Sequence, residues 1–126
     1  MFNQEIWENR KVFVTGHTGF KGSWLSFWLT QLDAKVIGYA LDPLTDPNLF
    51  SVLDIEKRVI DHRDDMCDLT TLERVIKSAK PEIIIHMAAQ SLVRESYMDP
   101  VGTYETNVLG TVNILEASRI CDSVRV

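Results

Sequence analysis

The sequence predicts an α/β fold in which helices cover both faces of a parallel sheet, the doubly wound arrangement. Three observations support this prediction. Short β-branched runs alternate with segments of helical spacing along the 126 residues. The runs are almost continuously apolar, which is typical of strands buried on both faces. Connections between parallel strands are right-handed, so the alternation leaves essentially one topology.

The first half of the chain supplies a strand, a tight turn, a helix and a second strand. Residues 11–15 form a short apolar run, and residues 20–32 carry apolar side chains at helical spacing. A second strand is predicted over 35–41 and ends before Pro43. The segment 44–53 is predicted to be an irregular loop with room for one helical turn.

The second half repeats the alternation. We expect a weaker strand over 57–62, a helix over 69–79 and the most strand-like segment over 82–87. Asp99 followed by Pro100 is typical of a helix start and predicts a long helix from that point. Residues 123–126 resemble the opening of a fifth strand. We therefore expect residues 1–126 to form one domain, a sheet truncated at its fifth strand.

The composition excludes several classes of protein. Apolar residues make up 45% and charged residues 25%, which argues against a disordered tail. The net charge of −5 has the wrong sign for binding nucleic acid along a surface. No apolar run is long enough to span a membrane, and residues 1–5 lack the basic start of a signal peptide, so we expect a cytoplasmic protein. Cys67 and Cys121 lie far apart and predict free thiols in or near the core, with no metal site.

A glycine-rich loop follows the first strand and opens the first helix, which is the context of a phosphate-binding loop. Gly16 permits the sharp turn, Gly19 lets the backbone approach a pyrophosphate, and Gly22 lets the helix pack close to the strand. The helix start favours an anion through its free N–H groups and its dipole. A tight turn without a ligand is the alternative. The predicted cofactor-binding residues here are Gly16, His17, Thr18, Gly19, Phe20, Lys21 and Gly22.

This loop resembles the T-G-x-x-G-F-x-G motif of the extended short-chain dehydrogenases/reductases, whose fold is of the Rossmann type. Two positions depart from the usual pattern. His17 replaces a small residue, and we expect its bulk to weaken or reshape cofactor binding. Lys21 replaces an apolar residue; it opposes the helix dipole but could reach a phosphate, and a solvated surface lysine is the alternative.

A carboxylate after the second strand selects between nicotinamide cofactors. An acidic side chain there accepts a hydrogen bond from the adenosine ribose, whereas an arginine accommodates a 2′-phosphate. Residues 40–45 contain Asp42 and no cation, so the sequence favours NAD. The family's aspartate aligns best with Ala40, and Asp42 comes two residues later on the same side of an extended chain. A turn residue is the alternative for Asp42.

Two further segments resemble motifs of the family. The run Asp65-Met66-Cys67-Asp68 resembles D-I-x-D, which implies that Asp65 accepts from the adenine amino group, that Met66 covers the ring and that Asp68 caps the next helix. A solvated acidic loop is the alternative. The run from His86 resembles H-x-A-A, which implies small residues next to the nicotinamide ribose. The cofactor-binding residues predicted there are Ala88, Ala89 and Gln90.

The residues around this second motif carry three more predictions. His86 lies within a strand and is expected to be a hydrogen-bonded structural histidine. Ser91, Val93 and Arg94 are expected in the following loop, facing the substrate. Arg94 suits the phosphates of a sugar nucleotide, and an ion pair with Glu95 or Asp99 is equally consistent with the sequence.

The long helix carries Thr106-Asn107-Val108-Leu109-Gly110-Thr111, which resembles the family's T-N-x-x-G-T. The resemblance implies that Asn107 steadies the backbone around the active site and takes part in binding the cofactor. Gly110 is expected to let neighbouring elements pack closely. The outer face of this helix forms the dimer surface in many relatives, so a homodimer or a higher homo-oligomer is expected by analogy.

The resemblance extends over the whole chain and is strongest to the members that dehydrate nucleotide sugars, with CDP-glucose as the expected substrate. That chemistry needs a tyrosine with a lysine four residues later. Tyr39, Tyr97 and Tyr104 have no such lysine, so no catalytic residue is predicted in this chain and the catalytic groups are expected beyond residue 126. The alternatives are another NAD-dependent nucleotide-sugar epimerase or decarboxylase, and a non-catalytic NAD-sensing regulator.

Overall fold

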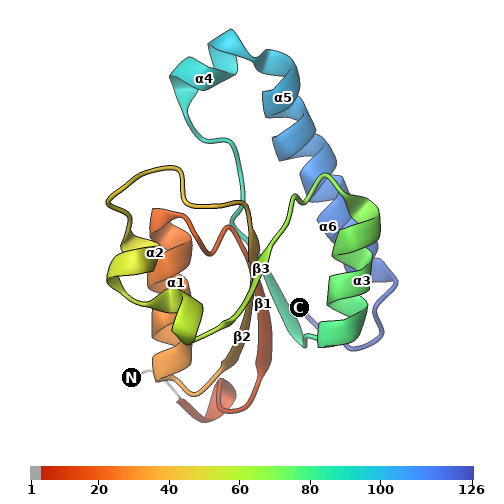
Figure 1. Cartoon of the computed structure of the whole chain (residues 1–126). Helices are drawn as coiled ribbons and strands as arrows, with labels where there is room; N and C mark the ends of the chain where they lie inside the picture. Colours follow the sequence, from red (N-terminus) through yellow and green to blue (C-terminus); the bar gives the residue numbers. More distant parts are fainter. Residues whose placement is uncertain (1–3) are drawn as a thin grey trace.

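A computed structural model describes residues 4–126 and shows a parallel four-stranded sheet between two layers of helices (Figure 1). The strands are β1 (Lys11–Thr15), β2 (Lys35–Ala40), β3 (Ile60–Arg63) and β4 (Ile83–His86). Their order across the sheet is β3-β2-β1-β4, and each pair is parallel. The predicted doubly wound, Rossmann-type arrangement is confirmed.

The helices divide between the two faces. The helices α1 (Phe20–Gln31) and α2 (Leu49–Val52) lie on one face, and α3 (Leu69–Ala79) packs beside α6 (Gly110–Arg119) on the other (Figure 1). The helix α2 is the single helical turn predicted within 44–53. None of the helices in the described part of the chain is long and apolar enough to cross a membrane. The expectation that no signal peptide is present rests in part on residues 1–3, which lie outside the described residues.

The long predicted helix is divided in the structure. It consists of α5 (Pro100–Tyr104), the π-helical segment η3 (Glu105–Leu109) and α6. Asp99 caps it as predicted, because its Oδ1 accepts from the amide of Gly102 at 3.0 Å. An unpredicted helix, α4 (Val93–Met98), precedes this cap and lies with α5 beyond the end of the sheet (Figure 1).

Two strand predictions need correction at their ends. The third strand was expected over 57–62, but β3 starts later because Ile55–Lys57 forms the 3₁₀ helix η2. Its Ile55 carbonyl accepts from the amides of Arg58 and Val59. Residues 123–126 do not form the predicted fifth strand, but the last two of them are hydrogen-bonded to the backbone at β4. The Arg125 amide donates to the Glu82 carbonyl, and Val126 accepts from the Ile84 amide, both at 2.8 Å.

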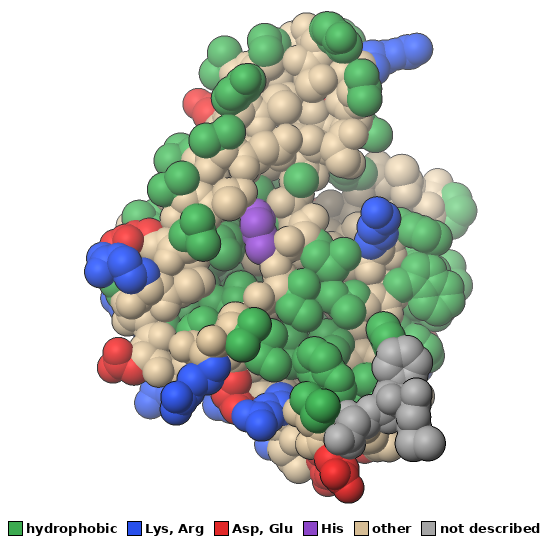
Figure 2. All heavy atoms as spheres, turned by 180° about the vertical axis from the view of Figure 1, so that it is seen from behind, with side chains coloured by type: hydrophobic (Ala, Val, Ile, Leu, Met, Phe, Trp, Pro, Cys, Tyr) green, Lys and Arg blue, Asp and Glu red, His purple; other side chains and the backbone are tan. Residues whose placement is uncertain are grey.

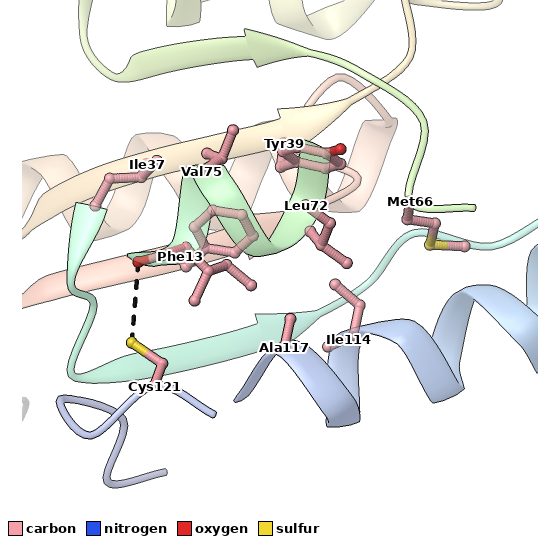
Figure 3. Close-up of a cluster of buried hydrophobic side chains, with 10 residues drawn as sticks. Phe13, Ile37, Tyr39, Met66, Leu72, Val75, Ile114, Ala117 and Cys121 are labelled. Atoms are coloured by element: carbon pink, nitrogen blue, oxygen red, sulfur yellow. Dashed lines mark hydrogen bonds between the residues drawn. The ribbon is translucent and has the colours of Figure 1, made fainter. Parts of the chain in front are cut away.

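The core has two halves because successive side chains of a strand point to opposite faces. On β1, Phe13 faces α3 and α6, whereas Val12 and Val14 belong to the cluster that contains Leu29 of α1. Figure 3 shows the first cluster, in which the sulfur of the buried Cys121 donates to the Ile76 carbonyl of α3 at 3.9 Å. Both cysteines are free thiols, as predicted.

Hydrophobic side chains also gather on the surface. The long helix exposes an outer row that includes Val101, Tyr104, Val108 and Leu115, and Figure 2 shows hydrophobic side chains on this helix and across the middle of the same view. These residues belong to the helix face for which a dimer contact was expected by analogy.

Candidate cofactor-binding site

The candidate site lies where the carboxyl ends of the parallel strands meet, the position at which open α/β sheets bind ligands. The glycine loop after β1 reaches both neighbouring strands. The Gly16 amide donates to the Tyr39 carbonyl at 2.9 Å, and Thr18 Oγ1 donates to the Leu41 carbonyl at 2.9 Å. The loop is therefore fixed to the end of β2.

Gly16 and Gly22 lie so close to neighbouring backbone atoms that neither position has room for a Cβ atom. Gly16 has φ of +74°, and a Cβ atom there would lie 2.8 Å from the Ala88 amide nitrogen. A Cβ on Gly22 would overlap the carbonyl group of Gly16. The predicted turn at Gly16 is confirmed, whereas Gly22 packs against the loop itself and not against the strand.

The start of α1 has the features that a pyrophosphate requires. Gly19 is the N-cap and supplies no side-chain cap, and the first helical amide that donates in the described part of the chain is that of Ser23, to the Gly19 carbonyl at 2.8 Å. The amides of residues 20–22 have no acceptor within residues 4–126. A Cβ on Gly19 would meet only the Gly16 carbonyl oxygen, at 3.4 Å. The loop therefore fits a bound anion.

His17 lies inside the protein and away from this open surface. Its side chain is fully buried, its ring occupies the space that a Cβ on Gly38 would need, and it stands edge-on to Phe50 at 5.5 Å between ring centroids. Nε2 donates to Asp61 Oδ1 at 2.5 Å. Burial lowers the pKa of His17, so the ring is neutral with its proton on Nε2. The expectation that the bulk of this ring weakens or reshapes cofactor binding needs correction, because the side chain points into the protein and not toward the surface of the loop.

Asp61 connects His17 to a second partner, Arg63. Arg63 Nε donates to both carboxylate oxygens of Asp61, at 2.9 and 3.0 Å, and Nη1 donates to Asp42 Oδ1 at 2.6 Å. The guanidinium carbon lies 4.6 Å from the centre of the Phe50 ring. Burial alone would raise the pKa of Asp61, but the hydrogen bonds from Arg63 and His17 outweigh burial and lower it, so Asp61 is a carboxylate. We call Asp42, Arg63, Asp61 and His17 the charged network.

Arg63 and Asp61 were not predicted as site residues. Residues 40–45 contain no cation, but Arg63 pairs with Ala40 across the two strands, which brings its guanidinium to Asp42. The spacing of Asp61 and Arg63 could have indicated their contact, because residues two apart on a strand lie on the same face.

Thr15 starts a second set of contacts that carries no charge. Thr111 Oγ1 donates to the Asn107 carbonyl at 2.6 Å and therefore accepts from His86 Nε2 at 3.1 Å. His86 Nδ1 then accepts from Thr15 Oγ1 at 2.7 Å. Burial lowers the pKa of His86, which favours this neutral ring. We call Thr15, His86, Thr111 and Asn107 the neutral chain; it supports the predicted structural role of His86.

The neutral chain holds the backbone that follows β4. Thr15 Oγ1 accepts from the amides of Met87 and Ala88 at 3.0 and 3.1 Å. Asn107 Oδ1 accepts from the Gln90 amide at 2.8 Å, and Asn107 Nδ2 donates to the Gln90 carbonyl at 2.9 Å. Asn107 thus steadies this backbone, and it does so from the π-helical segment η3. Ala89 lies exposed between these fixed points.

The Gln90 side chain is also used within the protein. Its Nε2 donates to Thr103 Oγ1 at 3.0 Å, and its Oε1 accepts from the Leu92 amide at 2.6 Å. The segment before α4 is therefore tied to α5.

Asp65 and Met66 occupy different environments. Asp65 is exposed, and its Oδ1 accepts from the Cys67 amide at 2.9 Å. Met66 is 5% exposed and packs in the core, where a Cβ on Gly110 would lie 2.7 Å from its Cε (Figure 3). The prediction that Met66 covers an adenine ring needs correction, because its side chain turns into the core. The close approach predicted at Gly110 is confirmed. Asp68 caps α3, accepting from the Thr71 amide at 3.1 Å.

Of the predicted substrate residues, Ser91 lies in the loop as expected, whereas Val93 and Arg94 do not. Val93 and Arg94 are the first residues of α4, and Ser91 lies two residues before this helix. All three are exposed. Within the described residues Arg94 forms no salt bridge, so the alternative pairing with Glu95 or Asp99 is absent there.

The first turn of α1 exposes two of the predicted cofactor-binding side chains. Phe20 is 69% exposed, and Lys21 is exposed beside it. Both alternatives for Lys21, a phosphate contact and a solvated lysine, are consistent with this placement.

A family model described as GDP-mannose 4,6 dehydratase matches residues 13–126. The chain belongs to the GDP-mannose 4,6-dehydratase family. A CDP-glucose 4,6-dehydratase of Salmonella typhimurium is 49% identical over 99% of this chain and 35% of its own length. The dTDP-glucose 4,6-dehydratase 1 of Escherichia coli is 34% identical over 86% of this chain and 31% of its own length. The chain spans about a third of the length of these two relatives.

Solved structures confirm the fold of this chain. A UDP-glucose 4-epimerase of Thermus thermophilus in complex with NAD has a TM-score of 0.75 and 35% identity, and it covers 86% of this chain and 33% of its own. An epimerase of Methanothermobacter thermautotrophicus has a TM-score of 0.81 and 26% identity, with 96% of this chain and 34% of its own covered. The resemblance to extended short-chain dehydrogenases/reductases is confirmed.

Proposed function

We propose that this chain is the NAD-binding part of a CDP-glucose 4,6-dehydratase, a lyase that converts CDP-glucose to CDP-4-dehydro-6-deoxyglucose. The observation that carries the proposal is the 49% identity to the Salmonella CDP-glucose enzyme over 99% of the chain, against 34% for the Escherichia coli dTDP-glucose enzyme. His17 and Lys21, unusual in the wider family, fit this member. The product is a precursor of deoxysugars of the kind used in lipopolysaccharide O-antigens, and we propose a cytoplasmic location.

The chain's own residues fit the binding of NAD. NAD held there would supply the acceptor for the hydride from C4 of the sugar and the donor of that hydride to C6, once water has been lost from C5 and C6. The open amides of residues 20–22 suit the pyrophosphate. Asp42 and Asp65, both exposed, are proposed to accept from the adenosine ribose and the adenine amino group. Ala88 and Ala89 are proposed to lie against the nicotinamide ribose.

The residues near α4 supply the proposed substrate contacts. Arg94 carries a free guanidinium within the described part of the chain, which suits the diphosphate of a nucleotide sugar. Ser91 and Val93 lie next to it and offer a hydroxyl group and an apolar contact. Because Asn107 and Gln90 fix the backbone before this segment, it starts from a defined position.

The acid–base groups are proposed to lie outside this chain. Removal of the C4 hydroxyl proton needs a tyrosine close to a lysine, and none of the tyrosines of this chain is followed by a lysine four residues later. We propose that these 126 residues bind NAD without turning over substrate, and that the longer protein is a homodimer or a higher homo-oligomer.

The test is an assay of the full-length gene product with CDP-, dTDP-, GDP- and UDP-glucose in the presence of NAD. The expected result is a 4-keto product from CDP-glucose, with deuterium supplied at C4 recovered at C6. Failure to form this product from CDP-glucose overturns the proposal.

An epimerase is the second candidate, because a UDP-glucose 4-epimerase is 35% identical over 86% of the chain. The same assay separates the two enzymes. An epimerase returns the hydride to C4 and yields the C4 epimer, and it leaves no 4-keto sugar. NAD binding without any product would point to the non-catalytic regulator.

A further inference from the structure

The contact between Asp42 and Arg63 has a consequence for the choice of cofactor. Asp42 is proposed to meet the adenosine ribose, and its side chain is 86% exposed. The guanidinium of Arg63 touches the same carboxylate at 2.6 Å, and the side chain of Arg63 is 27% exposed. The group that would recognise a 2′-phosphate is therefore next to the group that excludes one.

Arg63 has the fixed orientation that a phosphate-binding arginine needs. Its Nε donates to both oxygens of Asp61, and its guanidinium carbon lies over the Phe50 ring, 4.6 Å from the ring centre. These contacts use Nε and leave the two terminal nitrogens, of which Nη1 donates to Asp42. Nη2 has no acceptor within the described residues. A guanidinium keeps its charge at any physiological pH and binds phosphate through paired N–H groups.

The charges of the charged network explain why this arginine does not attract a 2′-phosphate in the natural protein. Asp42 and Asp61 are both carboxylates beside one guanidinium, and His17 is neutral. The cluster therefore carries an excess negative charge, which repels a phosphate. Removal of the Asp42 carboxylate would cancel this excess and free Nη1 while Asp61 keeps the guanidinium in place.

We propose that Asp42 and Arg63 together determine the cofactor specificity of this protein, with Asp42 masking Arg63 as a latent site for the 2′-phosphate of NADP. This proposal rests on the proposed function, since it assumes that the adenosine ribose lies at Asp42. Its new element is Arg63, a residue of β3 that the segment 40–45 does not contain.

The test measures cofactor binding by calorimetric titration of the full-length gene product, without turnover. We expect Asp42→Ser to strengthen NADP binding about tenfold or more, as one charge-assisted hydrogen bond allows. NAD binding should weaken several-fold in the same variant. In Asp42→Ser/Arg63→Gln the gain in NADP binding should disappear. Asp122→Ser, which removes an exposed carboxylate after α6, is the matched control and should change neither affinity.

A second measurement needs no change at Arg63, whose loss also removes hydrogen bonds to Asp61. Wild-type protein and Asp42→Ser are titrated with 5′-AMP and with adenosine 2′,5′-bisphosphate, which differ only in the 2′-phosphate. The ratio of the two affinities should shift toward the bisphosphate in Asp42→Ser. An unchanged ratio here, or a gain in NADP binding that survives Arg63→Gln in the first measurement, overturns the proposal.

Failure of this proposal is distinguishable from failure of the proposed function. If the wild-type protein binds NAD and forms the 4-keto product while Asp42→Ser gains no affinity for NADP, only the specificity proposal is wrong. If the specificity changes as expected but CDP-glucose gives no product, the dehydratase proposal is wrong and the specificity proposal is supported.

Discussion

The two ends of the candidate site are built from different kinds of contact. Where β2 and β3 end, the charged network joins two carboxylates, a guanidinium and a buried imidazole. Where β1 and β4 end, the neutral chain joins two threonine hydroxyls, an imidazole and the backbone of η3. Each end contains one histidine with a pKa lowered by burial, and in both the ring is neutral.

The difference shows how each end can be changed. In the neutral chain each hydrogen bond fixes the direction of the next, so the loss of one hydroxyl affects the whole chain. In the charged network the exposed pair at Asp42 can be removed while the half-buried part stays intact, because Asp61 holds Arg63 by itself. The charged end is therefore the part of the site whose ligand preference can change without loss of the fold.

The largest expected effect is on stability, from His17→Ala. This change removes a fully buried ring, leaves a cavity beside Gly38 and takes one partner from Asp61. We expect the free energy of unfolding to fall by about 3 kcal/mol in urea denaturation of the full-length protein. His62→Ala is the control, since His62 is half-buried on the same strand as Asp61. Equal losses in the two variants would show that the Asp61 contact contributes nothing.

Thr15→Val tests the neutral chain with little change in side-chain volume. His86 Nδ1 loses its donor, and the amides of Met87 and Ala88 lose their acceptor. The expected loss is about 2 kcal/mol of unfolding free energy. Thr30→Val removes a hydroxyl that, among residues 4–126, bonds only to the Phe27 carbonyl within α1, and it should cost less than about 0.5 kcal/mol. A Thr15→Val variant as stable as the Thr30→Val control contradicts this account.

A smaller effect should appear in the dependence of stability on pH. The pKa values of His17 and His86 are lowered by burial from 6.5. The unfolded chain therefore takes up protons at a higher pH than the folded chain, and acidification below about 6.5 favours unfolding. We expect the urea midpoint to fall between pH 7.5 and pH 5.5, and the slope to decrease in His17→Ala. A midpoint that stays constant or rises over this range would refute the neutral assignment of both rings.

The smallest expected effect is that of Asp42→Ser on stability. Its carboxylate is exposed and its ion pair with Arg63 is at the surface, so the unfolding free energy should change by less than about 1 kcal/mol. The measurement is the same urea titration, repeated at high salt, where the difference from wild type should shrink further. A large loss would mean that Asp42 supports the fold, and the change in cofactor preference would then not be separable from folding.

The local features of this chain could be predicted from sequence because they depend on neighbouring residues. Strand and helix alternation follows from the period of the apolar residues. The caps at Asp68 and Asp99 and the turn at Gly16 depend on one residue type at one backbone position. These features were sufficient to predict the topology and the phosphate loop.

The tertiary structure decided where the side chains of the site point. His17 meets Asp61 across 44 positions of sequence, and Arg63 meets Asp42 across 21. Met66 turns into the core because Gly110 leaves room for it. Asn107 reaches Gln90 from a π-helical segment that separates α5 from α6. The sequence by itself determined that a phosphate loop exists, while contacts between distant residues determined that His17 is buried and that a cation stands beside Asp42.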